Sequence, residues 1–240
     1  MKKIFYWSPH ISNVATVKNV INSAKSLKLH SKKPIEVTLL NAIGEWNSFK
    51  EELDRFKINL FDMNGIKLKK YLPINGYFKS RMTFLIIFFT KYFSLKKILR
   101  NQKPDFLIIH LITILPIILL IFSKFETKFI LRISGYPKLG IVRKFLWRIL
   151  LKKIYIVTTP TLLTYNLLVD NKIVDKSKII VLKDPVIKIN QISKSNFKNF
   201  KFDNKEEYYL AVGRLTKQKN FEFLVKAYAN LKTDKKLFIA

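Results

Sequence analysis

The stretch Leu210-Ala-Val-Gly-Arg-Leu-Thr-Lys-Gln-Lys-Asn-Phe221 decides how this sequence is interpreted. An apolar run at 208–212 enters Gly213, a polar turn with several cations follows, and apolar residues at helical spacing begin at Phe221. Backbone N–H groups and the helix dipole both favour an anion at such a turn. The pattern predicts a strand–turn–helix unit in which Gly213, Arg214 and Lys219 bind a diphosphate. An ordinary surface turn is the alternative, because many surface turns carry Gly-Arg.

The same alternation of apolar strand and helix runs back through the rest of the chain. Strands that are apolar throughout, separated by helices, indicate a doubly wound, Rossmann-like parallel sheet of the α/β class. Residues 106–122 are nearly all apolar, but His110 and Pro116 interrupt them. A spanning helix needs about 20 apolar residues. We therefore expect a buried strand and a buried helix there, with a membrane span as the alternative.

Residues 188–206 are rich in Asn, Ser and Lys and lose the apolar periodicity, which is typical of a linker. The sequence thus predicts a Rossmann-like domain at 1–188, a linker at 189–206 and the start of a second Rossmann-like domain at 207–240. We expect this second domain to be incomplete, because the pattern stops inside its next strand.

Composition narrows the classes of function. The 240 residues carry a net charge of +29 and include no cysteine, which excludes disulfides and thiolate metal sites. Such a charge attracts nucleic acid, anionic lipid or phosphorylated substrates, although ordinary solvated lysine-rich faces are the alternative. No zinc spacing or helix-turn-helix signature is present, which argues against nucleic acid. The apolar run after Met1 is too short for a secretory signal, so we expect a cytoplasmic protein.

A family resemblance adds to this interpretation. Residues 211–221, with Leu224 and Ala227, resemble the opening of the donor domain of group 1 glycosyltransferases, which are retaining, nucleotide-sugar-dependent enzymes of the GT-B fold. Lys183-Asp-Pro-Val186 is similar to the family's Asn-Pro-Val segment before the interdomain linker, with Asp184 in place of Asn. The segments 132–137 and 156–161 resemble a subset that builds bacterial surface polysaccharides.

The resemblance implies transfer of a sugar from a nucleotide-diphosphate sugar to a saccharide or lipid-linked acceptor. It implies no metal and no cofactor beyond the donor, whose own phosphate stabilises an oxocarbenium-like sugar. It places Gly213, Arg214 and Lys219 on the donor diphosphate, and His110 in the cleft as the candidate catalytic residue. A buried core histidine is the alternative for His110.

Two further residues are candidates for contact with acceptor or phosphate. Arg132 ends a strand at the edge where open parallel sheets bind ligands, although it can equally pair with a carboxylate. His10 follows the first strand, where the family usually has a glycine-rich loop. The segment Ser8-Pro-His-Ile-Ser-Asn13 contains no glycine, so that part of the site departs from the family.

A basic amphipathic helix is expected between Leu139 and Lys153. Its apolar residues form a stripe, and Lys144, Arg148 and Lys152 recur every four residues on another face. Basic amphipathic segments suit an anionic membrane surface, which predicts a peripheral location at the inner face of the plasma membrane. A solvated face is the alternative.

A second class of function stays open. The family's second donor motif, two glutamates separated by seven residues, is expected downstream of residue 240. The competing hypothesis is therefore a truncated, non-catalytic remnant, or a binding module that retains the acceptor-domain fold.

Overall fold

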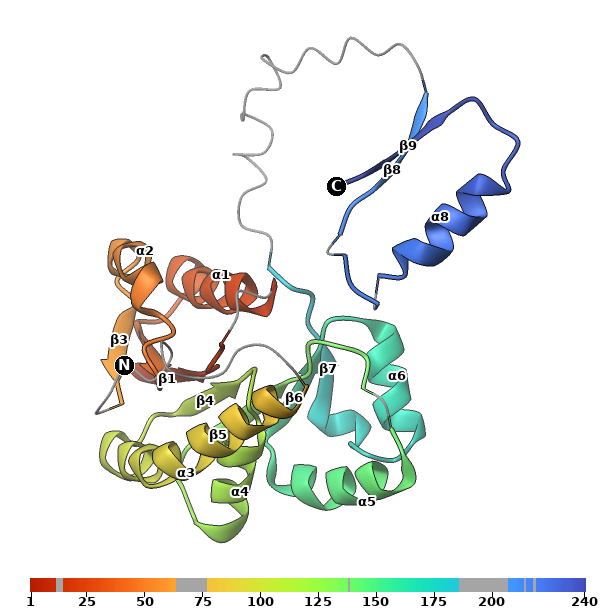
Figure 1. Cartoon of the computed structure of the whole chain (residues 1–240). Helices are drawn as coiled ribbons and strands as arrows, with labels where there is room; N and C mark the ends of the chain where they lie inside the picture. The colour runs from red at the N-terminus through yellow and green to blue at the C-terminus, as the bar shows by residue number, and fades with distance from the viewer. Residues whose placement is uncertain (12–14, 64–76, 138, 186–206, 214, 218) are drawn as a thin grey trace. The chain divides into compact units, whose positions relative to one another are not determined.

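The computed structural model describes residues 1–11, 15–63, 77–137, 139–185, 207–213, 215–217 and 219–240 (Figure 1). They belong to two compact units, Met1–Ile187 and Lys188–Ala240, which are taken one at a time below. The predicted linker at 189–206 lies outside the described residues.

The first unit is built on a seven-stranded sheet with the order β3-β2-β1-β4-β5-β6-β7, in which every neighbouring pair is parallel. The strands are β1 (Lys2–Trp7), β2 (Ile35–Asn41), β3 (Asn59–Asp62), β4 (Phe106–Ile109), β5 (Lys128–Arg132), β6 (Ile156–Thr159) and β7 (Ile179–Val181). The order reverses direction after β3, as in a doubly wound fold, so the predicted sheet is confirmed.

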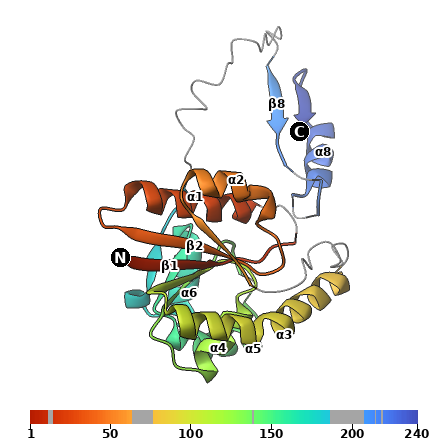
Figure 2. The same ribbon diagram turned by 90° about the vertical axis from the view of Figure 1, so that its left-hand side faces the viewer.

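Helices cover both faces of this sheet. They are α1 (Ala15–His30), α2 (Lys50–Arg55), α3 (Tyr77–Gln102), α4 (Ile114–Phe122), α5 (Ile141–Leu150) and α6 (Leu162–Asp170), with short 3-10 turns at Asn47–Phe49, Leu151–Lys153 and Lys176–Lys178. Figure 2 shows α1 and α2 on one side of the sheet and α3, α4 and α5 on the other. Right-handed crossovers explain the change of side, since the chain moves across the sheet in opposite directions before and after β3.

The alternation of side chains along the strands divides the core into two clusters. In β1, Ile4 and Tyr6 join a cluster with α1, whereas Phe5 and Trp7 join a larger cluster with α3 and α4. Successive side chains of a strand point to opposite faces, so a strand covered by helices on both faces is apolar throughout.

The apolar segment 106–122 forms a strand and a helix, as expected. Strand β4 lies between β1 and β5, and a turn with Ile112 in the left-handed region (φ 48°) leads to α4. Within the described ranges, no helix combines the length and apolarity needed to cross a membrane.

The second unit contains β8 (Tyr208–Ala211), α8 (Phe221–Ala229) and β9 (Lys236–Ile239). The two strands are parallel, with Tyr208 paired to Lys236 and Ala211 to Ile239. The β–α–β unit predicted from the residues around Gly213 is therefore present.

Candidate functional site

All carboxyl ends of the parallel strands meet at one edge of the first sheet, where open α/β folds bind their ligands. His10 follows β1, Asn41 ends β2, His110 follows β4 and Arg132 ends β5. The sheet thus brings the predicted residues His10, His110 and Arg132 to one edge.

His110 is held at the centre of this edge. Its backbone N–H donates to the Trp7 carbonyl at 3.0 Å, and its ring stacks on Tyr6 with 6.0 Å between centroids. The side chain is buried, and its Nδ1 has no hydrogen-bond partner among the described residues. Burial, and secondarily the charge of Arg132, lower the pKa of His110 to about 3. The imidazole is therefore neutral at pH 7 and has an unused nitrogen for a polar ligand.

His10 is also buried, and its ring meets Trp46 edge-on with 4.6 Å between centroids. Trp46 follows β2, so this contact joins the ends of two neighbouring strands. The hydroxyl of Ser8 nearby is buried without a hydrogen-bond partner in the described part of the chain. An inward-facing polar group of this kind is unusual unless something else binds there.

Arg132 pairs with a carboxylate, which is one of the two alternatives that the sequence left open for this residue. Its guanidinium donates to the Leu182 carbonyl and to the Asp184 carboxylate, which follow β7, the last strand of this sheet. Arg132 is buried, whereas the Asp184 side chain is about one-third exposed. The pair fixes Arg132 at the carboxyl edge of the sheet, and its predicted role toward acceptor or phosphate stays a prediction.

Sequence reasoning missed a polar cluster at the end of β2. The side-chain amide of Asn41 donates to Asn47 at 2.8 Å and to Asp62, and its oxygen accepts from the Trp46 backbone at 3.1 Å. Buried Glu45 accepts from the backbone N–H groups of residues 42 and 43 at 3.1 and 2.7 Å. The sequence signal that could have revealed this cluster is an asparagine at the end of an apolar strand, followed by Gly44 (φ 87°) and an acidic residue.

Lys91 brings a cation from α3 to the same region. It is buried, and its Nζ donates to the Met63 carbonyl at 3.1 Å. Burial lowers the pKa of Lys91, while the charge of Glu45 opposes that shift. The end of β2 is therefore surrounded by carboxylate, amide and ammonium groups that the fold holds in place.

The predicted donor turn lies in the second unit. A Cβ on Gly213 would come within 3.3 Å of the Phe221 ring and 3.5 Å of the Lys219 side chain. A larger residue at 213 would therefore have to displace the Phe221 ring by a few tenths of an ångström, while the φ of Gly213 is not positive. Its N–H donates to the Ala240 carbonyl at 2.8 Å, and Asn220 precedes α8 in the left-handed conformation. Lys219 therefore lies beside Gly213 just before α8, while Arg214 lies outside the described residues.

The three predicted membrane-face cations lie along α5 and just after it. Lys144 and Arg148 belong to α5, and Lys152 belongs to the 3-10 turn that follows. Arg148 donates to the Asn171 carbonyl at 2.9 Å. The apolar stripe beside them is exposed to solvent.

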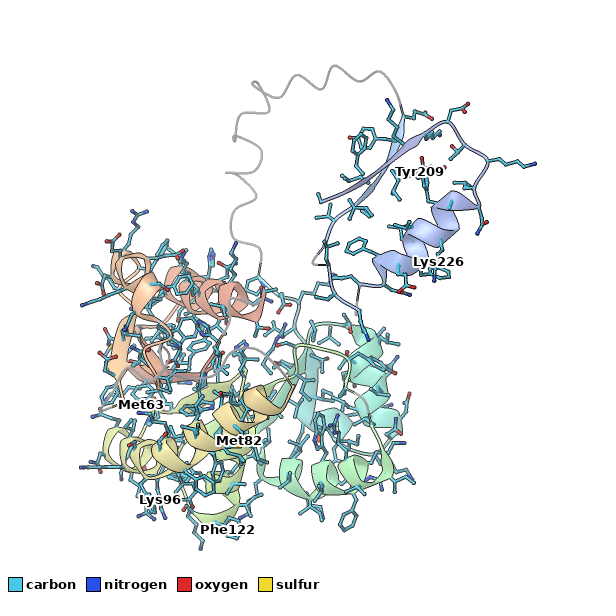
Figure 3. The ribbon with its side chains drawn as sticks, in the orientation of Figure 1. Met63, Met82, Lys96, Phe122, Tyr209 and Lys226 are labelled. Atoms are coloured by element: carbon cyan, nitrogen blue, oxygen red, sulfur yellow. The ribbon has the colours of Figure 1, made fainter. Side chains whose placement is uncertain are left out.

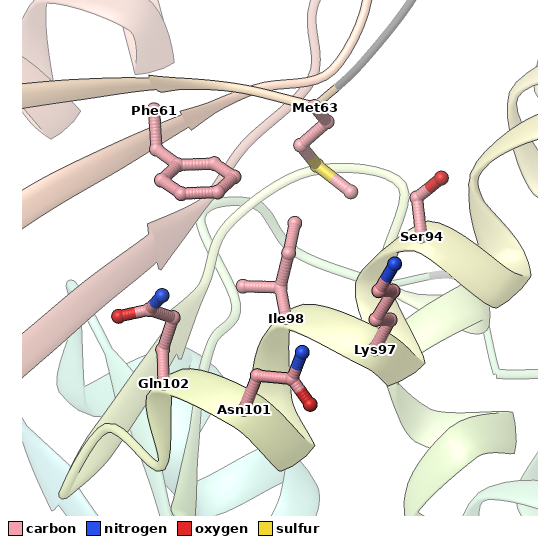
Figure 4. A pocket seen from close by; sticks show the side chains of 7 residues that line it. All are labelled: Phe61, Met63, Ser94, Lys97, Ile98, Asn101 and Gln102. Carbon is pink, nitrogen blue, oxygen red and sulfur yellow. The ribbon is translucent and has the colours of Figure 1, made fainter.

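A small pocket of about 140 Å³ lies between the end of β3 and the C-terminal half of α3 (Figure 4). Phe61, Met63 and Ile98 form its apolar part, and Ser94, Lys97, Asn101 and Gln102 form its polar rim. None of the predicted site residues lines this pocket, and it lies at the edge strand of the sheet.

Comparison with known proteins identifies the architecture. No protein-family model matches the sequence, and no curated protein matches it. Solved structures do match: a glycosyltransferase from Rickettsia africae ESF-5 superposes with a TM-score of 0.60 at 18% identity, covering 100% of this chain and 68% of that one. The fold is GT-B.

Two further solved structures widen the comparison. The lipopolysaccharide outer core galactosyltransferase WaaB, in its apo form, has a TM-score of 0.60 at 15% identity, over 100% of this chain and 60% of that one. A UDP-GlcNAc 2-epimerase from Neisseria meningitidis, bound to UDP-GlcNAc, has a TM-score of 0.52 at 15% identity, over 100% of this chain and 72% of that one. The superpositions establish the predicted fold, and at these low identities they show the fold alone.

Proposed function

We propose that the protein is a glycosyltransferase that moves a sugar from a nucleotide-diphosphate sugar to a saccharide or lipid-linked acceptor in cell-surface polysaccharide synthesis. The observation that carries the proposal is the GT-B likeness to glycosyltransferases over the whole chain. The arrangement around Gly213 supports it, because Lys219 lies beside Gly213 just before the N-terminus of α8, and a helix N-terminus with a nearby cation favours a diphosphate.

In this proposal the two units have different tasks. The donor diphosphate binds at Gly213, Arg214 and Lys219. The Arg214 guanidinium donates two hydrogen bonds to phosphate oxygens, and Lys219 provides a localised positive charge. In the first unit, neutral His110 forms a hydrogen bond with a sugar hydroxyl at the carboxyl edge of the sheet, while His10 and Arg132 border the acceptor or a phosphate. The reaction needs no metal, and the enzyme works in the cytoplasm at the inner face of the plasma membrane.

Donor binding tests the proposal directly. We expect UDP and UDP-GlcNAc to bind the 240-residue chain in calorimetry, and Lys219→Ala and Arg214→Ala each to weaken binding about tenfold, as loss of a charged hydrogen bond does. Lys232→Ala, an exposed lysine beyond α8, is the matched control and should bind normally. Unchanged affinity in both turn variants would show that the diphosphate assignment is wrong.

Product analysis then separates the competing functions. A labelled sugar that passes from UDP-GlcNAc to a saccharide acceptor supports transfer. Donor binding with no turnover supports the non-catalytic binding module, and inversion of the sugar without transfer supports an epimerase, whose fold this chain shares.

A further inference from the structure

Helix α5 presents its apolar side chains to solvent. Ile141 is 89% exposed, Val142 72%, Phe145 61% and Ile149 48%, and Leu146 is similarly open. The opposite side of the helix, with Trp147 and Leu150, packs against the core. Singly scattered apolar residues are normal on a surface, but a contiguous stripe of five on one helix indicates an interaction site.

Cations border this stripe. At helical spacing, Lys144 and Arg148 lie one turn apart along one side of the exposed apolar residues. The Lys144 N–H bonds to the Gly140 carbonyl at 2.9 Å, so the helix is regular from its first turn. An apolar centre with a basic border is the pattern of helices that lie in the interface of a membrane.

A basic groove lies beside α5, toward the loop that joins α6 to β7. It measures about 400 Å³ and carries four cations, Arg148, Lys152, Lys172 and Lys178, against the single carboxylate of Asp175. Arg148 and Lys178 are oriented by carbonyl groups, those of Asn171 at 2.9 Å and Lys152 at 3.0 Å. A carbonyl positions a cation without neutralising it, so the groove keeps a positive charge.

An apolar groove lies on the other side of the helix, between α5 and the start of α4. It measures about 690 Å³, and its lining includes Ile114, Val142, Leu146 and Trp147. Figure 1 shows α5 beside α4 in the same helix layer. In that layer Met82 on α3 and Phe122 at the end of α4 are also exposed (Figure 3).

We infer that this surface docks the protein on an anionic lipid bilayer. The α5 face is defined as the apolar residues Ile141, Val142, Phe145, Leu146 and Ile149 with the basic groove beside them. The apolar residues enter the boundary between headgroups and acyl chains, and the groove binds a lipid phosphate. The inference rests on the proposed membrane location and adds the exposed apolar residues that enter the bilayer and a groove for a lipid phosphate.

Charge complementarity selects a bilayer as the occupant. The net charge of +29 and the four-to-one excess of cations in the groove favour a negatively charged surface. A second copy of the chain suits the face less well. In a two-fold dimer the same patch meets itself, so the cations of both copies would face each other.

Vesicle flotation of the 240-residue chain tests the inference. We expect binding to phosphatidylcholine vesicles that contain phosphatidylglycerol, and at least tenfold weaker binding to phosphatidylcholine alone. The triple variant Ile141→Ser, Phe145→Ser, Ile149→Ser should lose most binding to both. The triple variant Lys144→Gln, Lys152→Gln, Lys172→Gln should lose the preference for anionic vesicles.

Matched controls separate the α5 face from the general positive charge. Lys32→Gln, Lys33→Gln, Lys50→Gln removes three exposed cations from elsewhere in the first unit, and Leu29→Ser removes an exposed apolar residue from α1. Both controls should bind like the parent chain. Equal losses in these controls, or no loss in the α5 variants, would overturn the inference.

Tryptophan fluorescence gives a second measurement. Of the three tryptophans, Trp7 and Trp46 are fully buried in the core, while Trp147 of α5 is only partly buried and lines the apolar groove with Val142 and Leu146. Lipids brominated in their acyl chains should therefore quench Trp147 selectively, and Trp147→Phe should abolish the quenching. Quenching that persists in that variant would place the contact elsewhere.

Two further outcomes decide between occupants. A chain that sediments as a dimer without lipid and becomes monomeric in the serine triple variant would overturn the inference in favour of a second copy. UDP binding measured on the same preparations reports separately on the proposed function, because the α5 variants leave the Gly213 turn unchanged.

Discussion

Helices α1 and α5 each join neighbouring parallel strands, and each repeats apolar residues at helical spacing. In α1 those residues, Val17, Val20, Ile21 and Ala24, are at most 3% exposed and form the core beneath the helix. In α5 the equivalent stripe faces solvent, and only Trp147 and Leu150 reach the core. Periodicity therefore identifies an apolar face, but it does not say what that face contacts.

The largest expected difference is in stability. Ile21→Ala in α1 should lower the free energy of unfolding by about 3 kcal/mol, because it opens a cavity in the core. The same substitution at Ile149 in α5 should change it by less than about 0.5 kcal/mol, since that side chain is half exposed. Urea denaturation of both variants measures the two values. Similar losses would mean that α5 buries its stripe in solution.

Acid should weaken the core on the α1 side, where His110 stacks on Tyr6. The pKa of His110 is lowered to about 3 in the folded protein, so below about pH 6.5 the unfolded chain binds more protons than the folded one. The neutral His110 therefore contributes its full share to the free energy of unfolding above about pH 6.5. That share decreases as the pH is lowered, by about 2 kcal/mol at pH 5.

Denaturation at pH 8 and pH 5 measures this effect. His110→Gln removes the titrating group, so the difference between the two pH values should shrink by that amount. Ile149→Ala, on the α5 face, should keep the full difference. An unchanged pH dependence in His110→Gln would assign the acid sensitivity to other groups.

A smaller effect compares the cations of the two helices. On α1, buried Lys25 pairs with Glu52 and lies 4.5 Å from the centroid of the Phe56 ring. Glu52→Gln leaves a buried ammonium without its counterion and should cost about 1 kcal/mol, reduced by the partial exposure of Glu52.

The matched change after α5 is Lys152→Gln, which removes an exposed cation and should alter stability by less than about 0.5 kcal/mol. Thermal unfolding of the two variants checks the contrast. A comparable loss for Lys152→Gln would mean that this lysine supports the fold and is not kept for a ligand.

Local signals in the sequence predicted the fold well. Apolar runs and helical spacing located the strands and helices, and His110 and Pro116 in an otherwise apolar segment favoured a strand and helix over a membrane span. The Gly213 stretch predicted the GT-B fold by resemblance, and the structural comparisons confirm that fold.

Contacts between residues far apart in the chain could not be predicted from the sequence. Nothing near Arg132 marks Asp184 as its partner, because the pair depends on β5, β6 and β7 lying side by side. The burial that lowers the pKa of His110 also depends on the assembled sheet. The outward orientation of α5 could not be predicted either, because the same spacing suits a core.

The contacts made by Arg132 have a mechanical consequence. Asp184 and Pro185 end the described part of the first unit, and they are clasped by the Arg132 guanidinium and by the Asn22 amide, which donates to the Pro185 carbonyl at 3.1 Å. A pull on the chain beyond Pro185 would therefore act on these side chains and on strand β5 as well as on β7, because Arg132 ends β5. These two contacts therefore anchor the end of the first unit to the interior of its sheet and to helix α1.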